Sequence, residues 1–114
     1  MNKEELKNFY QALFDSNEEL VMQMIADEAQ YILHGGLRYE GKADFAQMIK
    51  DMKESQMDYV EIENIVSDNQ HAALNGILNL KSGAKMPFCE FVTFTEDRKI
   101  LRIDSYVVAV DNAG

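Results

Sequence analysis

A glutamate stands in the middle of an apolar, strand-forming segment near the end of the chain. Glu90 lies within residues 88–94, among aromatic and β-branched side chains that favour a strand. Because side chains alternate along a strand, an inward Glu90 would share a face with Phe88, Val92 and Phe94. Burial would then raise the pKa of its carboxyl and suit it to donate a hydrogen bond or act as a general acid or base. The alternatives are a glutamate that faces water, or a buried one satisfied by a neighbouring tyrosine or asparagine.

Three other polar side chains are candidates to join Glu90 in a site. His34 ends a strand-like segment, and an imidazole there is a candidate base at neutral pH. A one-residue difference in strand register decides whether it points inward, and a lone histidine is equally compatible with a structural role. Asn75 and Asn79 lie two pleats apart on the preceding strand, where they would orient a carbonyl or hydroxyl group, cap Glu90, or face water.

Tyrosines offer phenol groups to the same pocket. Tyr31 and Tyr39 lie on strand-like segments of the first half of the chain. Tyr10 falls on the apolar stripe of a predicted helix, so core packing is the expected role of its ring.

Composition excludes several classes of function. The 114 residues carry a net charge of −9, which argues against nucleic acid and against an anionic membrane surface as partners. The two histidines and single cysteine have no ligand spacing, and the chain has no phosphate-binding loop or nucleophile elbow, so neither metal nor cofactor is expected. The start lacks the apolar run of a signal peptide, and the lone Cys89 cannot form an internal disulfide. These features indicate a cytoplasmic protein.

The first part of the chain predicts helices. Apolar residues at positions 6, 9, 10, 13 and 14 form one helical stripe, with Asn2 as N-cap and Glu5 three residues later. Ser16 and Glu19 form a capping-box pattern that predicts a second helix, with its apolar face within residues 20–25. A third helix is expected after Gly41, over residues 45–52.

The rest of the chain predicts strands. Residues 29–33 and 37–40 are strand-like, and a period of two begins at residue 57. Turn signals at 67–70, 81–84 and 96–98 divide the remainder into four strands, the last over residues 100–110, and the tail 111–114 is expected to fray. Helices followed by hairpins predict one domain over residues 1–114, of the α+β class with a mostly antiparallel sheet.

The order of these elements resembles a known family. It comes with three short segments: Ala26-Asp27-Glu28-Ala29-Gln30-Tyr31, Gly41 before the third helix, and Lys99-Ile100-Leu101-Arg102-Ile103 near the end. Over nearly the whole chain this resembles the nuclear transport factor 2-like superfamily, in particular its SnoaL-like polyketide cyclase and ketosteroid isomerase branch. The resemblance implies three N-terminal helices packed in a curved sheet, a cystatin-like α+β barrel with a conical pocket.

The resemblance also implies a homodimer that pairs through the outer face of the sheet. Leu74, Leu78 and Leu80 share one strand face, and burial between two copies would remove such an apolar face from water. The alternative is that these leucines face the helices while the asparagines between them face water.

The isomerase machinery of that branch transfers only in part. There, a tyrosine on the first helix and a protonated acid form an oxyanion hole, and an aspartate on the first strand is the base. The resemblance places the acid at Glu90, the tyrosine at Phe9 and the base at Leu33, beside His34. Because Phe9 and Leu33 cannot transfer a proton, ketosteroid isomerase activity is not expected.

Two functional hypotheses follow. The first is a cofactor-independent isomerase, cyclase or dehydratase acting on a small hydrophobic carbonyl compound, with Glu90 as acid or base and His34 or Tyr31 as its partner. The second is a non-catalytic ligand-binding or dimerisation module of the same fold. In both, the pocket is expected to be lined by Phe9, Tyr31, Leu33, Asn75, Asn79, Phe88 and Val92.

Overall fold

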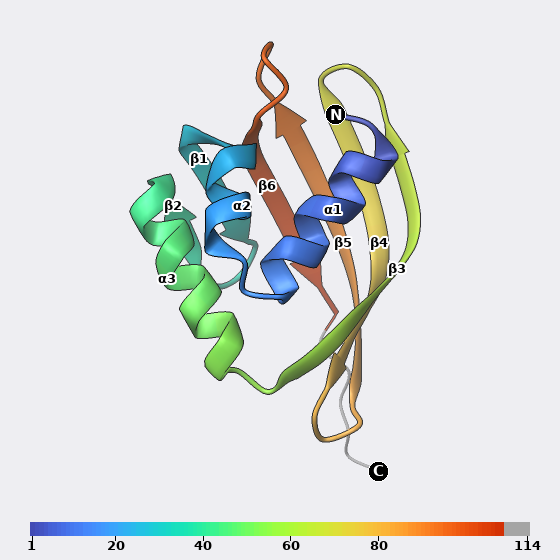
Figure 1. Ribbon diagram of the computed structural model, residues 1–114. Helices are drawn as coiled ribbons and strands as arrows, with labels where there is room; N and C mark the ends of the chain where they lie inside the picture. The colour runs from blue at the N-terminus through green and yellow to red at the C-terminus, as the bar shows by residue number, and fades with distance from the viewer. Residues whose placement is uncertain (109–114) are drawn as a thin grey trace.

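Three helices cover one face of a six-stranded sheet in the computed structural model, which describes residues 1–108 (Figure 1). The helices are α1 (Lys3–Phe14), α2 (Glu18–Met24) and α3 (Gly41–Glu54). The strands are β1 (Ile25–Leu33), β2 (Arg38–Glu40), β3 (Met57–Ser67), β4 (His71–Leu80), β5 (Lys85–Phe94) and β6 (Ile100–Val107). The end of the predicted last strand, residues 109–110, and the predicted frayed tail, 111–114, lie outside the described residues.

Local capping explains where the first two helices begin. The Asn2 side chain accepts from the Glu5 N–H at 2.8 Å while the Glu5 carboxylate accepts from the Asn2 N–H at 3.1 Å, which completes a capping box for α1. For α2 the prediction was wrong by one residue, because Asn17 and not Ser16 is the N-cap and accepts from the Leu20 N–H. Ser16 instead takes the left-handed turn between the helices, with a φ of 59°.

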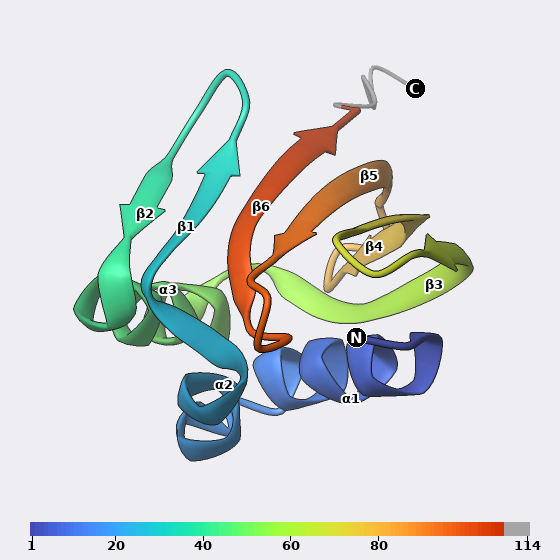
Figure 2. The same cartoon turned by 90° about the horizontal axis from the view of Figure 1, so that it is seen from above.

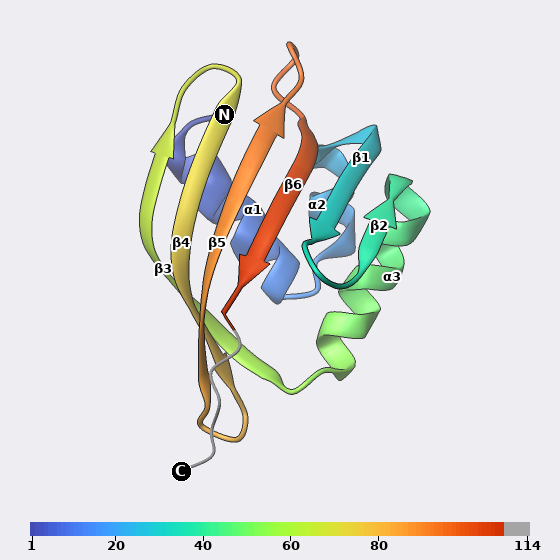
Figure 3. The ribbon, with the colours of Figure 1, turned by 180° about the vertical axis from the view of Figure 1, so that it is seen from behind.

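The sheet is mixed, with the strand order β2-β1-β6-β5-β4-β3. Every neighbouring pair is antiparallel except β1 and β6, which run parallel and bring the first strand beside the last. The sheet curves around the helices when seen from above (Figure 2). From behind, the strands stand in front of α1 and α2 while α3 lies beside the β2 edge, so no helix lies over the outer face of the sheet (Figure 3).

The register of β4 decides which of its side chains face the helices. Leu74 lies opposite Glu90 and joins the core, while Leu78 lies opposite Met86 on the same face. Asn75 and Asn79 point the other way, where Asn75 accepts from Asn64 at 3.0 Å and Asn79 donates to Glu61 at 2.9 Å. The expectation that these leucines form an outer, dimerising face was therefore wrong. The alternative is correct for the leucines, which face the helices, but Asn79 is only 5% exposed and does not face water.

A glycine permits a close backbone approach where β3 and β4 bend. The β3–β4 register shifts between Ile62 and Asn64, opposite Gly76. A Cβ atom placed on Gly76 would lie 1.9 Å from the carbonyl oxygen of Glu61, so any side chain there would force the two strands apart. The bend of the sheet at this point depends on the glycine.

Replacing this glycine is expected to destabilise the fold. Gly76→Ala should lower the free energy of unfolding by about 2–3 kcal/mol, because the added methyl collides with backbone atoms that cannot move aside. Urea denaturation measures the change. Ala73→Ser, on an outward-facing position of the same strand, is the control. An unchanged stability in Gly76→Ala would show that the close approach is not a constraint.

Candidate functional site

Glu90 is the centre of a buried hydrogen-bonded cluster. It shares the inner face of β5 with Phe88, Val92 and Phe94, and only 4% of it is exposed. The Tyr10 hydroxyl, from α1, donates to Glu90 Oε1, and the Tyr31 hydroxyl, from β1, donates to Oε2 at 2.6 Å. Each carboxylate oxygen is thus held by one phenol from a different layer of the molecule.

A serine hydroxyl beside this cluster has no partner. Ser105 lies directly opposite Glu90 on β6 and is 1% exposed. Its Oγ is the one buried side-chain polar atom of residues 1–108 that makes no hydrogen bond. The hydroxyl is near enough to lower the pKa values of Glu90 and Tyr31, but it lies outside hydrogen-bond geometry with either. A buried hydroxyl without a partner is costly unless something else supplies one.

Burial controls the protonation of these groups. Removal from water raises the pKa of the Glu90 carboxyl, an effect that the hydrogen bonds from Tyr10 and Tyr31 oppose. The pKa values of Tyr10 and Tyr31 lie well above 10, first because both are buried and then because the Glu90 charge is close. The two phenols therefore keep their protons and act as donors, while the carboxyl is the group that titrates.

The cluster lines a cavity of about 320 Å³. This volume is at the lower end of the range for small-molecule sites, roughly 300–1,000 Å³. Its wall is mostly apolar and includes residues from α1, α3 and the sheet: Leu13, Phe14, Met48, Met52, Leu78 and Phe88. Among its lining residues, Glu90 and Asp51 are the two carboxylic acids, and none is lysine, arginine or histidine.

A second polar pair stands on the same wall. The Tyr39 hydroxyl donates to Asp51 Oδ2 at 2.9 Å, and Gln47, one turn earlier on α3, donates to Oδ1 at 2.9 Å. These two hydrogen bonds lower the pKa of the Asp51 carboxyl, whereas burial and the bond to Asp51 raise that of Tyr39 to about 12. Tyr39 also lies opposite Tyr31 across β1 and β2, with ring centroids 6.5 Å apart.

The predicted pocket residues are distributed between the cavity, the core and the outer face. Tyr31, Leu33 and Phe88 line the cavity with Glu90. Phe9 and Val92 are fully buried in the core instead, and neither lines the cavity. Asn75 and Asn79 lie on the outer face of the sheet, because the alternation of β4 turns its leucines inward.

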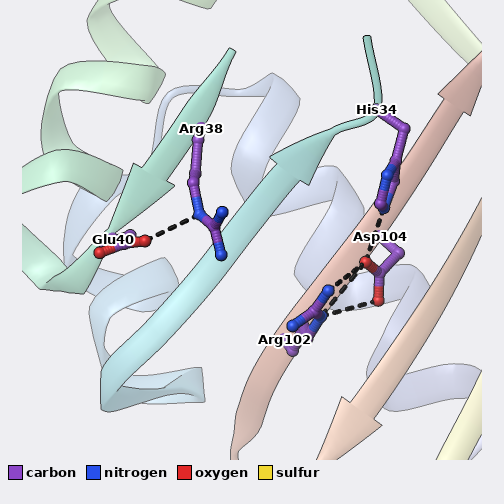
Figure 4. A network of polar contacts seen from close by, with 5 residues as sticks. All are labelled: His34, Arg38, Glu40, Arg102 and Asp104. Carbon is purple, nitrogen blue, oxygen red and sulfur yellow. Dashed lines mark hydrogen bonds and ion pairs between the residues drawn. The ribbon is translucent and has the colours of Figure 1, made fainter. Parts of the chain in front are cut away.

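His34 is not brought to Glu90. Tyr31 and Leu33 point into the cavity, so His34, one residue after Leu33, takes the outer face. There its Nε2 contacts Asp104 Oδ1 at 2.8 Å and its ring stacks on Tyr106, with centroids 4.5 Å apart. Two guanidinium nitrogens of Arg102 also hold Asp104 at 3.0 Å, and Arg38 forms a separate pair with Glu40 at 2.8 Å (Figure 4).

Sequence reasoning missed three members of the site. Tyr10 was expected to be core because it lies on an apolar stripe, and its ring is indeed packed edge-on against Phe9, but its hydroxyl reaches Glu90. Asp51 was not among the predicted site residues; its spacing of three from Met48, on the apolar face of α3, was the available signal. Ser105 alternates with Ile103 and Val107 on one face of the last strand, and this alternation was the available signal that it faces inward.

Residues 1–108 contain no group of three His, Cys, Asp or Glu side chains placed to hold a metal ion. None of the three helices in this part of the chain is long and apolar enough to cross a membrane.

The raised pKa of Glu90 predicts a specific dependence of stability on pH. Above its ordinary value of 4.5 the unfolded chain loses this proton before the folded protein does. The wild-type protein should therefore lose stability as pH rises through this window, by about 1.4 kcal/mol for each unit by which folding raises the pKa. Glu90→Gln lacks this loss, so its free energy of unfolding relative to wild type should increase with pH and then level off.

Urea denaturation of both proteins between about pH 4 and 8 measures this difference, in which the other titrating groups cancel. Glu61→Gln, on the outer face, is the matched control and should show no such trend. A flat difference between Glu90→Gln and wild type would mean that the Glu90 pKa is not raised.

Comparison with known families gives a match over most of the chain. The family model of the SnoaL-like domain matches residues 6–103. No match was found among the curated proteins.

Solved structures share this fold at low sequence identity. The epoxide hydrolase/cyclase-like enzyme SalBIII, described for pyran ring formation in salinomycin, superposes with a TM-score of 0.77 at 13% identity, over 92% of this chain and 88% of SalBIII. A candidate isomerase of the SnoaL-like family from Agrobacterium tumefaciens gives 0.75 at 15% identity, over 90% and 94%. A Catenulispora acidiphila protein with a ketosteroid isomerase-like fold, in complex with trimethylamine, gives 0.77 at 14% identity, over 95% and 88%. At these identities the likeness concerns the fold.

Proposed function

Because the chain belongs to the SnoaL-like domain family of the nuclear transport factor 2-like superfamily, we propose that its cavity is the conical pocket of that fold and acts on a small hydrophobic carbonyl compound. In this proposal Glu90 carries a proton to and from the carbon next to the carbonyl group, without a cofactor. The observation that carries it is a carboxyl buried in an apolar cavity, with both oxygens held by neutral donors and no basic residue in the lining. The reaction class is an isomerisation, cyclisation or dehydration.

The proposed proton transfer uses only side chains of this protein. The ionised Glu90 takes a proton from the carbon beside the carbonyl, the C–H electron pair moves into the new C–C double bond, and the carbonyl oxygen gains the negative charge. The free hydroxyl of Ser105 donates to that oxygen. Return of the proton to a different carbon completes an isomerisation. Attack of the carbanion on a second carbonyl carbon of the same molecule closes a ring, and the alkoxide that forms takes the proton from Glu90. Departure of a hydroxyl group from the neighbouring carbon, protonated by Glu90 as it leaves, releases water and completes a dehydration.

The surroundings of Glu90 suit it to this task. A general base is most effective when its pKa lies near the working pH, and burial moves the pKa of Glu90 in that direction. Tyr10 and Tyr31 fix the orientation of both oxygens before a ligand arrives. Tyr10 supplies the helix tyrosine that the resemblance placed at Phe9, and Leu33 lines the cavity without contributing a base.

The test is exchange of the acetyl protons of para-ethylacetophenone in D₂O, followed by proton NMR. The wild-type protein should accelerate exchange, with a rate that rises with pH as Glu90 ionises above 4.5. Glu90→Gln should lose about 10²- to 10⁴-fold of that acceleration, because an amide cannot accept the proton. Glu61→Gln is the control. Equal rates for Glu90→Gln and wild type would refute the assignment of the base.

The second candidate is a non-catalytic binding module, and one observation favours it. Both Glu90 oxygens already accept hydrogen bonds within the protein, as expected of a carboxyl that is structural. In that case para-ethylacetophenone should bind with no accelerated exchange, and Glu90→Gln should change stability but not exchange.

We also propose that two copies pair through the outer face of the sheet. Phe91 and Tyr106 are 43% and 49% exposed on this face, and Val66 is 64% exposed. The face has no helix over it, so a self-complementary contact across a two-fold axis would cover these side chains (Figure 3). Cys89 is exposed on the same face, and a thiol there is best kept reduced, which supports the cytoplasm as the compartment.

Light scattering after gel filtration tests this interface. The wild-type protein should have twice the chain mass of 13.0 kDa, and Phe91→Glu should shift it to the mass of one chain, because burying an unpaired carboxylate opposes association. Leu20→Glu, on α2 and away from this face, should leave the mass unchanged. A wild-type protein of single-chain mass would end the dimer proposal.

A further inference from the structure

The cavity lining contains acidic side chains and no basic ones. It holds two carboxyl groups, those of Glu90 and Asp51, without a basic side chain to balance them. The whole chain is also acidic, with a net charge of −9. The lining of the cavity and the net charge of the chain therefore both favour a cationic ligand over an anionic one.

The two carboxyls occupy different ends of the cavity. Glu90 is 4% exposed, whereas Asp51 is exposed at the surface of α3. Tyr31 and Tyr39 lie between them, since Tyr31 bonds Glu90 while Tyr39 bonds Asp51. Glu90 thus forms the inner end and Asp51 the solvent end.

Asp51 has unused capacity to bind a ligand. Its oxygens accept one hydrogen bond each, from Tyr39 and Gln47, and a carboxylate oxygen can accept two. No lysine, arginine or histidine within residues 1–108 forms an ion pair with Asp51. The two neutral donors fix the carboxylate in place and leave its charge uncompensated.

We propose that Asp51 is a second ligand-binding group, and that it selects carbonyl compounds whose far end carries an ammonium or another hydrogen-bond donor. The ligand class is a small apolar molecule with its carbonyl at Glu90 and Ser105 and its donor at Asp51. Met48 and Met52, on the same face of α3, supply apolar wall beside the carboxylate. Carboxylates and phosphates are disfavoured as ligand groups. This inference rests on the proposed function.

A purely structural Asp51 would behave differently. If its role were only to anchor Tyr39, then removing the Tyr39 hydroxyl would remove the effect of Asp51, and the sign of a ligand's charge would not matter. If Asp51 binds the ligand, its negative charge acts on the ligand directly. The preference for cationic over anionic ligands should then survive in Tyr39→Phe and be lost in Asp51→Asn.

The experiment compares three para-substituted acetophenones at pH 7 and low salt: the cationic aminomethyl, the neutral ethyl and the anionic carboxylate compound. Dissociation constants come from NMR titration. Wild type should bind the cation about threefold more tightly than the neutral probe and the anion about threefold more weakly, a total ratio near tenfold that shrinks with added salt. Asp51→Asn should bring this ratio close to one.

Glu54→Gln is the matched control, because it removes the same charge from the same helix at a residue that does not line the cavity; its ratio should equal that of wild type. Tyr39→Phe should also keep the ratio. Binding of the ethyl probe by wild type without discrimination between charges would overturn this inference and leave the proposed function standing. Failure of all three probes to bind wild type would overturn the proposed function and this inference with it.

Discussion

The burial of one carboxyl without a cationic partner is the constraint around which this molecule is organised. Taking an ionised carboxylate out of water costs several kcal/mol, of order 5 or more, unless donors replace the lost hydration. Tyr10 and Tyr31 are those donors, and they come from the first helix and the first strand. The Glu90 site therefore exists only when α1 lies against the inner face and β1 has joined β6. Loss of either phenol would leave a buried oxygen unsatisfied, so the same contacts that prepare Glu90 for chemistry also secure the fold.

Neighbouring residues of one strand face chemically different sides of the sheet. On β6, Ser105 faces the cavity while its neighbours Asp104 and Tyr106 face outward, where they contact His34. A parallel relation between β1 and β6 sets which side chains of the two strands meet on each face. The outer network of His34, Asp104 and Arg102 is consequently independent of Glu90, although some of its residues are adjacent in sequence to the cavity lining.

The two ends of the cavity combine different electrostatic conditions. Glu90 is deep, and burial raises its pKa; Asp51 is at the solvent end, and its hydrogen bonds to Gln47 and Tyr39 lower its pKa. The protein thus moves the pKa values of its two cavity carboxyls in opposite directions. A cavity lined by two acids and no base favours neutral or cationic ligands over anionic ones.

The sequence alone determined the features that depend on local periodicity: the order of helices and strands, the capping of α1 by Asn2, the turns, the family, and the shared face of Glu90 with Phe88 and Val92. Side-chain alternation is a property of a strand by itself, so it groups residues into faces. Which face of the sheet the helices cover is a property of packing. The sequence therefore left open, or predicted wrongly, the side-chain direction of the β4 leucines, Asn75, Asn79 and His34. The meeting of Tyr10 with Glu90, 80 residues apart, and the joint lining of one cavity by Ser105 and Asp51 were decided only by tertiary structure. These contacts join separate elements across the core, and no local pattern encodes the distance between them.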